Sequence, residues 1–422
     1  MGADRLIFHC DCNNFYASCE CLERPELKNV PMAVAGDPEY RTGVVVAKNE
    51  LAKKAGVKTT DTVWQARKKC PDIVFVRPRH DFYSEVSARV NSIYHEYTDY
   101  LEPASIDESY LDMTGAPKFY GMTPVELADA LRKRIREEIG ITISVGVSYN
   151  KVFAKMGSDY KKPDATTEIT RNNYRDILWP LPVSDLLFAG RATVEVLHKK
   201  MIKTVGDLAQ ADRTSLYKLL GKSGEQLWLY ANGLDQEKVR QWGDKEEVKS
   251  VSRGMTFRRD LVTEQEIHTG LSLLADEVAT QLRQQNLKGA VVQVQIKTPA
   301  LKSYSRQTTL PYHTFLQKEI LDTAMQLMRN NWHIGVSMPV RALTVGVTHL
   351  LPADQASEQL SLFDFAVGTD GNYTNREKQE RLEAAVDLVR QKHGSDMITH
   401  GFRDNEEIGV ARHKNPQNKS KE

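Results

Sequence analysis

Apolar and polar residues alternate over several short stretches of the chain, and each stretch predicts a β-strand. Three of them lie in the N-terminal part, at 6–12, 105–112 and 141–147. Two stretches with apolar residues at helical spacing, 79–100 and 124–138, separate these strands. This order predicts an α+β domain whose sheet is rich in antiparallel pairs and carries its helices on one side.

Residues 23–77 form an insertion into that domain. They contain two short apolar strands, at 31–35 and 43–47, and two short helices, at 49–54 and 63–69. Lysine and arginine are frequent in both helices. The pattern therefore predicts a small basic subdomain.

A helical region with a glycine turn follows. Residues 174–232 have a helical pattern throughout, and 186–193 and 201–208 read as two helices joined by a hairpin. Such a hairpin can present backbone N–H groups to a DNA phosphate, although an ordinary helical hairpin has the same pattern. The charged residues 235–250 then predict a linker.

The C-terminal part returns to an α+β pattern. Elements in 251–350 occur in the order βαββαβ, with helices at about 264–287 and 314–330. Eleven Lys and Arg against seven Asp and Glu leave an excess of four positive charges, which suits nucleic acid but also an ordinary solvated face. A final helix is predicted at 374–393, with Thr374 and Glu377 as its capping box.

Length, composition and charge limit the classes of protein to which the chain can belong. At 422 residues and 47.8 kDa the chain is long enough for about three domains, and 41% hydrophobic residues support real cores. The net charge of +1 does not by itself indicate a nucleic-acid partner. With a mean hydropathy of −0.48, no run of about 18 apolar residues and no signal-peptide pattern, we expect a cytoplasmic protein that is not bound to a membrane.

Five cysteines are too few and too clustered for a disulfide framework, which fits a reducing compartment. Four of them form two C-x-C pairs, Cys10 with Cys12 and Cys19 with Cys21. Zinc ligands are usually spaced C-x₂₋₄-C, so buried core cysteines explain the pairs better than a zinc site does.

The strongest chemical signal is the pair of adjacent carboxylates Asp107 and Glu108, which lie between apolar residues. Ionised carboxylates are costly to bury without a compensating cation, and Mg²⁺ prefers oxygen ligands. Asp11 ends the first predicted strand and is the candidate for a third ligand. Strict alternation would send Asp107 and Glu108 to opposite faces, so a shared metal requires a twist or bulge at the strand end.

Taken together, these motifs resemble those of the Y-family DNA polymerases, the lesion-bypass group. The matching segments, in this order, are Asp11-x-Asn13-x-Phe15-Tyr16-Ala17, Ser105-Ile106-Asp107-Glu108, and Ser148-Tyr149-Asn150-Lys151 with Lys162-Pro163. The agreement extends over residues 5 to about 350. It implies an α+β multidomain right hand: palm 1–22 and 78–167, fingers 23–77, thumb 168–234 with a helix-hairpin-helix, linker 235–250, little finger 251–350 and tail 351–422.

The resemblance also implies template-directed, low-fidelity DNA synthesis in damage tolerance, with two Mg²⁺ ions, or Mn²⁺, in each active site. The implied metal ligands are Asp11, Asp107, Glu108 and the main chain of Cys12, and the three carboxylates are the implied catalytic residues. One metal would lower the pKa of the primer 3′-hydroxyl, and the other would clamp the triphosphate.

Nucleotide contacts follow from the same resemblance. Tyr16 matches the family's steric gate against a ribose 2′-hydroxyl, and Lys162 matches a phosphate-binding lysine. The other implied nucleotide-binding residues are Asn13, Asn14, Phe15 and Lys53. The fingers depart from the common pattern, because Ala47, Glu50 and Lys53 stand where many members have Thr or Ser, Tyr and Arg. Lys53 can meet a phosphate only as a point charge, and Ala47 and Glu50 supply no equivalent contact.

The implied partners are primer–template DNA, dNTPs and a bacterial sliding clamp, and a monomer suffices. The implied DNA contacts are Gly190, Arg191, Arg253, Arg258, Lys297 and Arg306. In the thumb, Phe188 and Ala192 replace a Gly and a Lys that family members often have. Gln359-Leu360-Ser361-Leu362-Phe363 resembles the pentapeptide by which bacterial polymerases bind the clamp β subunit, since its apolar side chains could fill a pocket.

Two other functions are compatible with parts of the pattern. A DNA-binding accessory protein could keep the fold without the chemistry; the altered fingers suit it, but the complete set of three carboxylates does not. A cyclase could use the same two-metal palm, but it would have no use for the hairpin or the basic C-terminal region. DNA affinity that falls steeply with salt would separate both DNA-binding functions from the cyclase.

Overall fold

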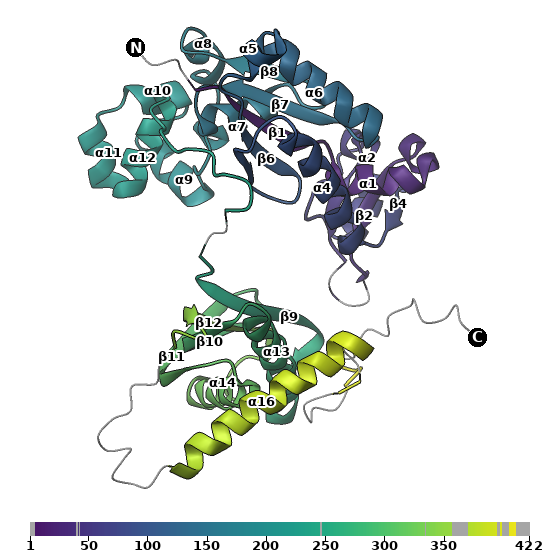
Figure 1. Ribbon diagram of the computed structural model, residues 1–422, viewed down its shortest axis with the longest axis vertical. Coiled ribbons are helices and arrows are strands. Elements are labelled where there is room, and N and C mark those ends of the chain that lie inside the picture. The colour runs from purple at the N-terminus through teal and green to yellow at the C-terminus, as the bar shows by residue number, and fades with distance from the viewer. Residues whose placement is uncertain are drawn as a thin grey trace. The chain divides into compact units, whose positions relative to one another are not determined.

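The computed structural model describes residues 5–38, 41, 43–244, 247–333, 335–356, 370–394, 397–398 and 405–410. The chain divides into two compact units, residues 1–36 with 43–245 and residues 37–42 with 246–422. Figure 1 shows the helices and strands of each unit. Among the described residues, no helix is both long enough and apolar enough to cross a membrane.

The first unit is built on a five-stranded sheet in the order β5-β6-β1-β7-β8. Its strands are β1 (Ile7–Cys12), β5 (Leu101–Pro103), β6 (Glu108–Asp112), β7 (Ile143–Ser148) and β8 (Thr166–Ile169). All neighbouring strands are antiparallel except β7 and β8. The strand predicted at 105–112 is shorter in the structure, because residues 104–107 form the turn between β5 and β6.

One face of this sheet packs against helices α1 (Phe15–Glu23), α4 (His80–His95) and α6 (Pro124–Glu138). The apolar residues of β1, β6 and β7 that point to this face join the helices in one hydrophobic core. Cys10, Cys12 and Cys19 belong to this core, and all five cysteines are buried with free thiols. The interpretation of buried core cysteines is therefore confirmed.

The other face of the sheet also carries a helix, so the prediction of helices on one side was wrong. Helix α7 (Lys151–Tyr160) packs against β1, β7 and β8. A Cβ at Gly146 of β7 would lie 1.8 Å from the carbonyl oxygen of Ala154 and 2.4 Å from the nitrogen of Ser158. The helix backbone can approach the sheet because the strand has no side chain at that point.

The insertion forms a second, three-stranded sheet in the order β3-β2-β4. Its elements are β2 (Met32–Ala35), β3 (Val45–Lys48), β4 (Val74–Val76), α2 (Glu50–Lys54) and α3 (Val63–Lys69). The two predicted strands and both predicted helices are confirmed. Strand β4 was not predicted, because three residues are too few for an alternating pattern; it pairs in parallel with β2.

The helical region contains α8 (Tyr174–Leu178), α9 (Arg191–Lys199), α10 (Val205–Gln210), α11 (Arg213–Leu220) and α12 (Lys222–Ala231). The predicted helix at 186–193 was wrong, because α9 begins only at Arg191. Phe188 has a φ of 67°, a left-handed conformation that interrupts helical hydrogen bonding and that glycine adopts more readily. The second predicted helix, 201–208, begins later than expected, at Val205.

The predicted linker at 235–250 is docked onto the first unit over its first half. Val239 is buried in a small apolar cluster with residues of β1, β6 and α7. Glu237 pairs with the buried Lys151 at 2.7 Å, and Arg240 pairs with the buried Glu102 at 3.1 Å. These contacts hold residues 237–240 against the first unit.

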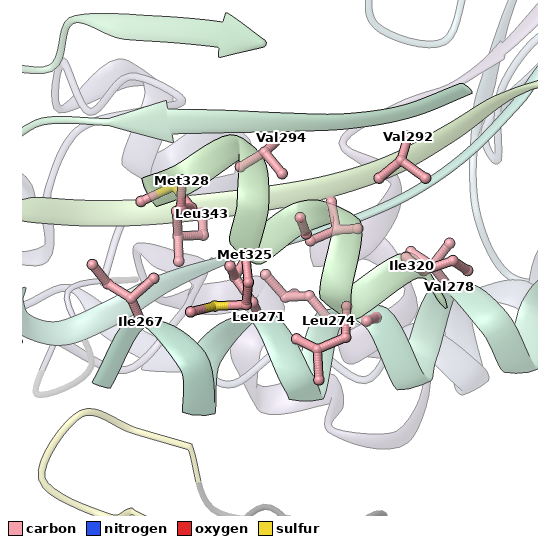
Figure 2. Close-up of a cluster of buried hydrophobic side chains, with 14 of the residues drawn as sticks. Ile267, Leu271, Leu274, Val278, Val292, Val294, Ile320, Met325, Met328 and Leu343 are labelled. Atoms are coloured by element: carbon pink, nitrogen blue, oxygen red, sulfur yellow. The ribbon is translucent and has the colours of Figure 1, made fainter. Parts of the chain in front are cut away.

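The second unit has a four-stranded antiparallel sheet in the order β11-β10-β12-β9. Its elements are β9 (Ser250–Leu261), α13 (Glu264–Gln284), β10 (Leu287–Lys297), β11 (Ser303–Thr314), α14 (Gln317–Asn331) and β12 (Val340–Pro352). The predicted βαββαβ order is confirmed. Figure 2 shows the core between helices and sheet, where Leu271 and Met325 pack with Val294 and Leu343.

A last helix, α16 (Asp370–His393), lies along α13 and α14 (Figure 1). It begins at Asp370, so the prediction of Thr374 as its N-cap was wrong. Arg283 of α13 pairs with Glu383 and, at 2.5 Å, with Asp387 of α16. The Arg283 and Glu383 side chains are 6% and 0% exposed, so α16 is held by a buried ion pair.

Candidate active site

Asp11 and Glu108 are cross-strand neighbours, because β1 and β6 pair with these residues directly opposite each other. Opposite residues of an antiparallel pair share one face of the sheet, and here it is the face that carries α7. Asp11 is 5% exposed, and the Glu108 side chain is 28% exposed. Two carboxylates side by side in such a place require a compensating cation.

Helix α7 supplies that charge through Lys155, a residue that the sequence analysis did not identify. Its ammonium lies 3.1 Å from Asp11 and 2.9 Å from Glu108. Lys162, just beyond the helix, lies 2.6 Å from Asp11. Lys151, Lys155 and Asp159 follow at intervals of four and share one face of the helix, and this spacing could have indicated Lys155.

Opposing effects act on the pKa of each carboxylate. Burial raises the pKa of Asp11 to about 6, although Lys162 and Lys155 act in the opposite direction. Burial also acts to raise the pKa of Glu108, but its contacts with His9 and Lys155 outweigh burial and hold that pKa well below its usual range.

His9 lies beside Glu108 and is completely buried. Its Nδ1 is 2.8 Å from Oγ of Ser158, and this hydroxyl donates its only proton to the carbonyl of Lys155. The hydroxyl can therefore only accept from the ring, so Nδ1 carries a proton. Nε2 faces Glu108 at 3.5 Å, which is beyond a good hydrogen-bond distance.

Asp107 does not join the other two carboxylates. It lies in the turn before β6, and its side chain accepts a hydrogen bond from Ser105 Oγ at 2.7 Å. Its carbonyl accepts from the N–H of Cys12 at 2.9 Å, which fixes its backbone beside the end of β1. Across the described residues, no three ligand side chains converge closely enough to hold a metal ion.

The residues nevertheless fit a divalent cation. The three candidate side chains are all carboxylates, the type of ligand that Mg²⁺ prefers. Asp11 and Glu108 already share one cation, the ammonium of Lys155. Asp107 lies outside the strand, so alternation does not fix its side chain on the opposite face.

The loop after β1 positions Lys162. The Asn13 side chain is buried, donates to Ser144 Oγ at 2.9 Å and accepts from the N–H of Asp164 at 2.8 Å. Asn13, which was predicted to bind nucleotide, therefore uses its side chain to hold the segment after α7 against β1 and β7. Lys162 reaches Asp11 from that segment.

Glu50, one of the departures from the family pattern, has contacts within the protein. It accepts a hydrogen bond from Asn14 at 3.0 Å, and Lys53 lies 3.5 Å from it. Asn14 has a φ of 49°, a left-handed conformation that asparagine tolerates. These contacts connect α2 to the loop that begins α1.

Tyr16 is held by a second aromatic ring. It stacks on Tyr83 of α4 at 4.3 Å between ring centroids, with an angle of 16° between the planes. The His80 ring packs against it in a T-shaped arrangement, at 5.8 Å between ring centroids. Its neighbour Phe15 is buried in the core below the sheet. The Tyr16 ring therefore has a fixed orientation next to the candidate site.

The predicted DNA contacts of the second unit lie on different faces of its sheet. Arg253 is opposite the buried Val345, and Arg306 is opposite the buried Val294, so both lie on the face that carries α13 and α14. Lys297 follows a residue of that core face and so lies on the open face. Arg258 donates to the carbonyl of Glu406.

The remaining predicted binding residues lie in the helical region and in the tail. Gly190 precedes α9 as its N-cap, and Arg191 is the first residue of that helix. The Arg191 side chain is 94% exposed and pairs with Glu195 at 3.0 Å. The predicted clamp-binding residues 359–363 lie outside the described residues.

Known proteins share both units of the chain. Residues 10–159 match the impB/mucB/samB family, and residues 248–362 match the C-terminal domain of that family. A solved chimeric Y-family DNA polymerase has a TM-score of 0.72 at 24% identity, over 82% of this chain and 99% of its own, and so shares the fold. DNA polymerase IV of Acetivibrio thermocellus is 42% identical over 398 residues, which are 94% of this chain and 97% of that relative. The chain belongs to the Y family of DNA polymerases, of the polymerase IV type.

DNA polymerase IV 1 of Bacillus subtilis agrees with this assignment, at 36% identity over 95% of this chain and 93% of its own length. The Y-family assignment made from the motifs is therefore confirmed, together with the α+β multidomain fold and the class of enzyme, a DNA-directed DNA polymerase. The N-terminal match of this Y-family chain, residues 10–159, contains Asp11, Glu108 and Lys155.

Proposed function

We propose that this translesion DNA polymerase adds nucleotides to a primer 3′-hydroxyl by two-metal catalysis, with low fidelity. The observation that supports this most is the pair of Asp11 and Glu108, side by side on a partly buried sheet face with the Lys155 ammonium between them. Carboxylates in this arrangement suit divalent cations that meet a nucleoside triphosphate.

Asp11, Asp107 and Glu108, with the main chain of Cys12, would hold two Mg²⁺ or Mn²⁺ ions. Ions bound there would lower the pKa of the primer hydroxyl and balance the charge on the triphosphate and the leaving pyrophosphate. Asp107 would give up its hydrogen bond with Ser105. Lys155 has an alternative partner in Asp159, 3.3 Å away and one turn further along α7.

The chain's own residues would bind and orient the nucleotide. Lys162 and Lys53 would contact its phosphates, and Tyr16 would stack under the sugar and exclude a 2′-hydroxyl. Tyr83 holds the Tyr16 ring in place, and Tyr16→Ala removes the ring that would exclude a 2′-hydroxyl. We therefore expect this variant to admit ribonucleotides while dNTP addition continues. Incorporation of each rNTP and dNTP by both proteins would check this. Unchanged sugar selectivity would show that Tyr16 is not the gate.

The proposed macromolecular partners are primer–template DNA and a sliding clamp. Lys297 on the open face of the second sheet, with Gly190 and Arg191 at the start of α9, would contact DNA phosphates. The segment 359–363 would bind the clamp. The protein would act in the cytoplasm. It would act as a monomer, since none of these roles requires a second copy.

Primer extension by the purified chain, with Mg²⁺ and single dNTPs on an undamaged template, tests the proposal. We expect short, template-directed addition that Asp107→Ala and Glu108→Ala abolish while DNA binding survives. Asp112→Asn, at the opposite end of β6, is the matched control and should retain activity. Retained activity in Asp107→Ala or Glu108→Ala would contradict the proposal.

A further inference from the structure

Trp64 is the most unusual surface residue of the insertion. It is the second residue of α3, and it is 70% exposed, although tryptophan is usually well buried. The helix below it is firmly held, because Thr62 and Gln65 form a capping box and Val63 and Ala66 are buried. The exposed ring therefore stands on a rigid support and is not part of a mobile end.

A positive charge accompanies the ring. The ammonium of Lys68, one turn along α3, lies 5.5 Å from the centroid of the Trp64 ring. The neighbouring cations have other contacts, since Lys69 pairs with Asp61 at 2.6 Å and Arg67 lies over the Phe75 ring at 5.6 Å. Trp64 and Lys68 thus form a separate aromatic and cationic pair.

The surroundings of this pair are strongly basic. Residues 43–77 contain eight Lys and Arg but only three Asp and Glu. A partner that covers Trp64 therefore has to be negatively charged and must present flat apolar surface to the ring. Unpaired nucleotides have both properties, because every base has a π-face and every nucleotide carries a phosphate.

We propose that Trp64 and Lys68 form a stacking site for an unpaired base of the single-stranded template, an inference that rests on the proposed polymerase function. A template-directed polymerase holds a template strand whose next nucleotides are still unpaired. An aromatic platform with a cation binds such bases without reading their sequence. This is the tolerance that a damaged template requires.

The test compares binding of two primer–templates without dNTPs, one with a single unpaired template nucleotide and one with about eight. We expect the unmodified chain to bind the longer overhang more tightly than the short one. Trp64→Ala should bind the longer overhang about tenfold more weakly than the unmodified chain does. Trp64→Phe should keep most of that affinity. Lys68→Met should lower the affinity for the longer overhang and the salt dependence of that binding.

The matched control is Phe119→Ala, which removes another exposed ring, 83% exposed, from helix α5 (Ala116–Tyr120) of the same unit. It should leave both affinities unchanged. Trp64→Ala should also extend a primer on the short overhang as the unmodified chain does, which shows that the site is folded.

If Trp64→Ala keeps the full gain from the longer overhang, the inference is wrong, and a protein partner becomes the better explanation of the exposed ring. Failure of the proposed function looks different, because the unmodified chain would then add no nucleotide to either primer. Binding measured without dNTPs does not depend on catalysis, so the two failures can be told apart.

Discussion

Lys155 is the lysine that neutralises both carboxylates of the candidate site, whereas Lys162 pairs with Asp11. Its ammonium lies within 3.1 Å of Asp11 and 2.9 Å of Glu108, and its side chain is only 15% exposed. Without it, two neighbouring carboxylates would repel each other in a partly buried place. A divalent cation bound at the same carboxylates would take over this role.

We therefore expect Lys155→Met to destabilise the protein by roughly 1–3 kcal/mol in EDTA, because one partner of a largely buried ion pair is removed. Millimolar Mg²⁺ should restore more stability to Lys155→Met than to the unmodified chain. Urea unfolding with and without Mg²⁺ measures both effects. Lys161→Met, which removes an exposed lysine beyond α7, is the control. Equal losses with and without Mg²⁺ would contradict this role of Lys155.

Glu20 illustrates a buried charge with a purely structural role. Its side chain has no exposed area and accepts hydrogen bonds from Arg79 at 3.0 Å and from Tyr83 at 2.7 Å. Burial acts to raise the pKa of Glu20, but the bonds from Arg79, Tyr83 and Arg24 outweigh burial and lower it below its usual value. The carboxylate thereby connects α1 to α4.

Because the folded-state pKa is lowered, Glu20 stabilises the protein at pH values above its unfolded pKa of about 4.3. This contribution is lost as the pH falls through the folded-state value. We expect Glu20→Gln to cost roughly 2–3 kcal/mol at neutral pH and clearly less near pH 3. Urea unfolding across this range measures it. Glu23→Gln, whose side chain is 53% exposed, should change stability by less than about 1 kcal/mol. A pH-independent loss in Glu20→Gln would contradict the ionic role.

Among the helices and strands, the contact of α7 with β7 positions Lys155. A Cβ at Gly146 would overlap the carbonyl oxygen of Ala154. Lys155 is the next residue of that helix, so any outward movement of α7 also moves its ammonium away from Asp11 and Glu108. Packing and site geometry therefore depend on the same glycine.

We expect Gly146→Ala to destabilise the first unit by about 3 kcal/mol or more, because backbone has to move to relieve the overlap. Thermal unfolding measures the loss. Gly190→Ala is the control for stability, since no atom lies within 4 Å of a Cβ built there and its φ is −69°. A Gly146→Ala protein as stable as the unmodified chain would show that α7 can move at little cost.

At the scale of the whole molecule, each unit has its own hydrophobic core. The core of the second unit lies between its sheet and α13 and α14, and α16 is fixed to them by Arg283 and Glu383. The first unit keeps residues up to about 242 through Val239, Glu237 and Arg240. Two separate cores predict two unfolding transitions.

We expect calorimetry to resolve these two transitions and Arg283→Met to lower only one of them. The variant removes the cation that pairs with the buried Glu383 carboxylate, which costs roughly 3–5 kcal/mol. Gly146→Ala should lower the other transition, so the two variants assign the transitions to the units. Lowering of both transitions by Arg283→Met would show that the two units unfold together.

Local patterns along the chain were enough to predict the elements and the chemistry that depend on neighbouring residues. Alternating residues predicted the central strands β1, β6 and β7 of the first unit and the βαββαβ order of the second, because strand and helix periods are local properties. The carboxylates Asp11, Asp107 and Glu108 and the family also followed from short motifs. These residues could be predicted because the spacing between the residues of a motif is the same wherever the motif lies in the fold.

Which distant segments meet became known only from the folded structure. It placed α7 on the second face of the sheet, brought Lys155 between Asp11 and Glu108, and turned Asp107 toward Ser105. In the structure, residues 235–242 also lie against the first unit. Their charged residues predicted an exposed linker, but Glu237 pairs with Lys151 and Arg240 pairs with Glu102. A periodic pattern specifies which face of an element is apolar but not which charge will lie opposite, since that depends on distant segments: Lys155 lies 47 residues from Glu108 and 144 from Asp11 in the sequence.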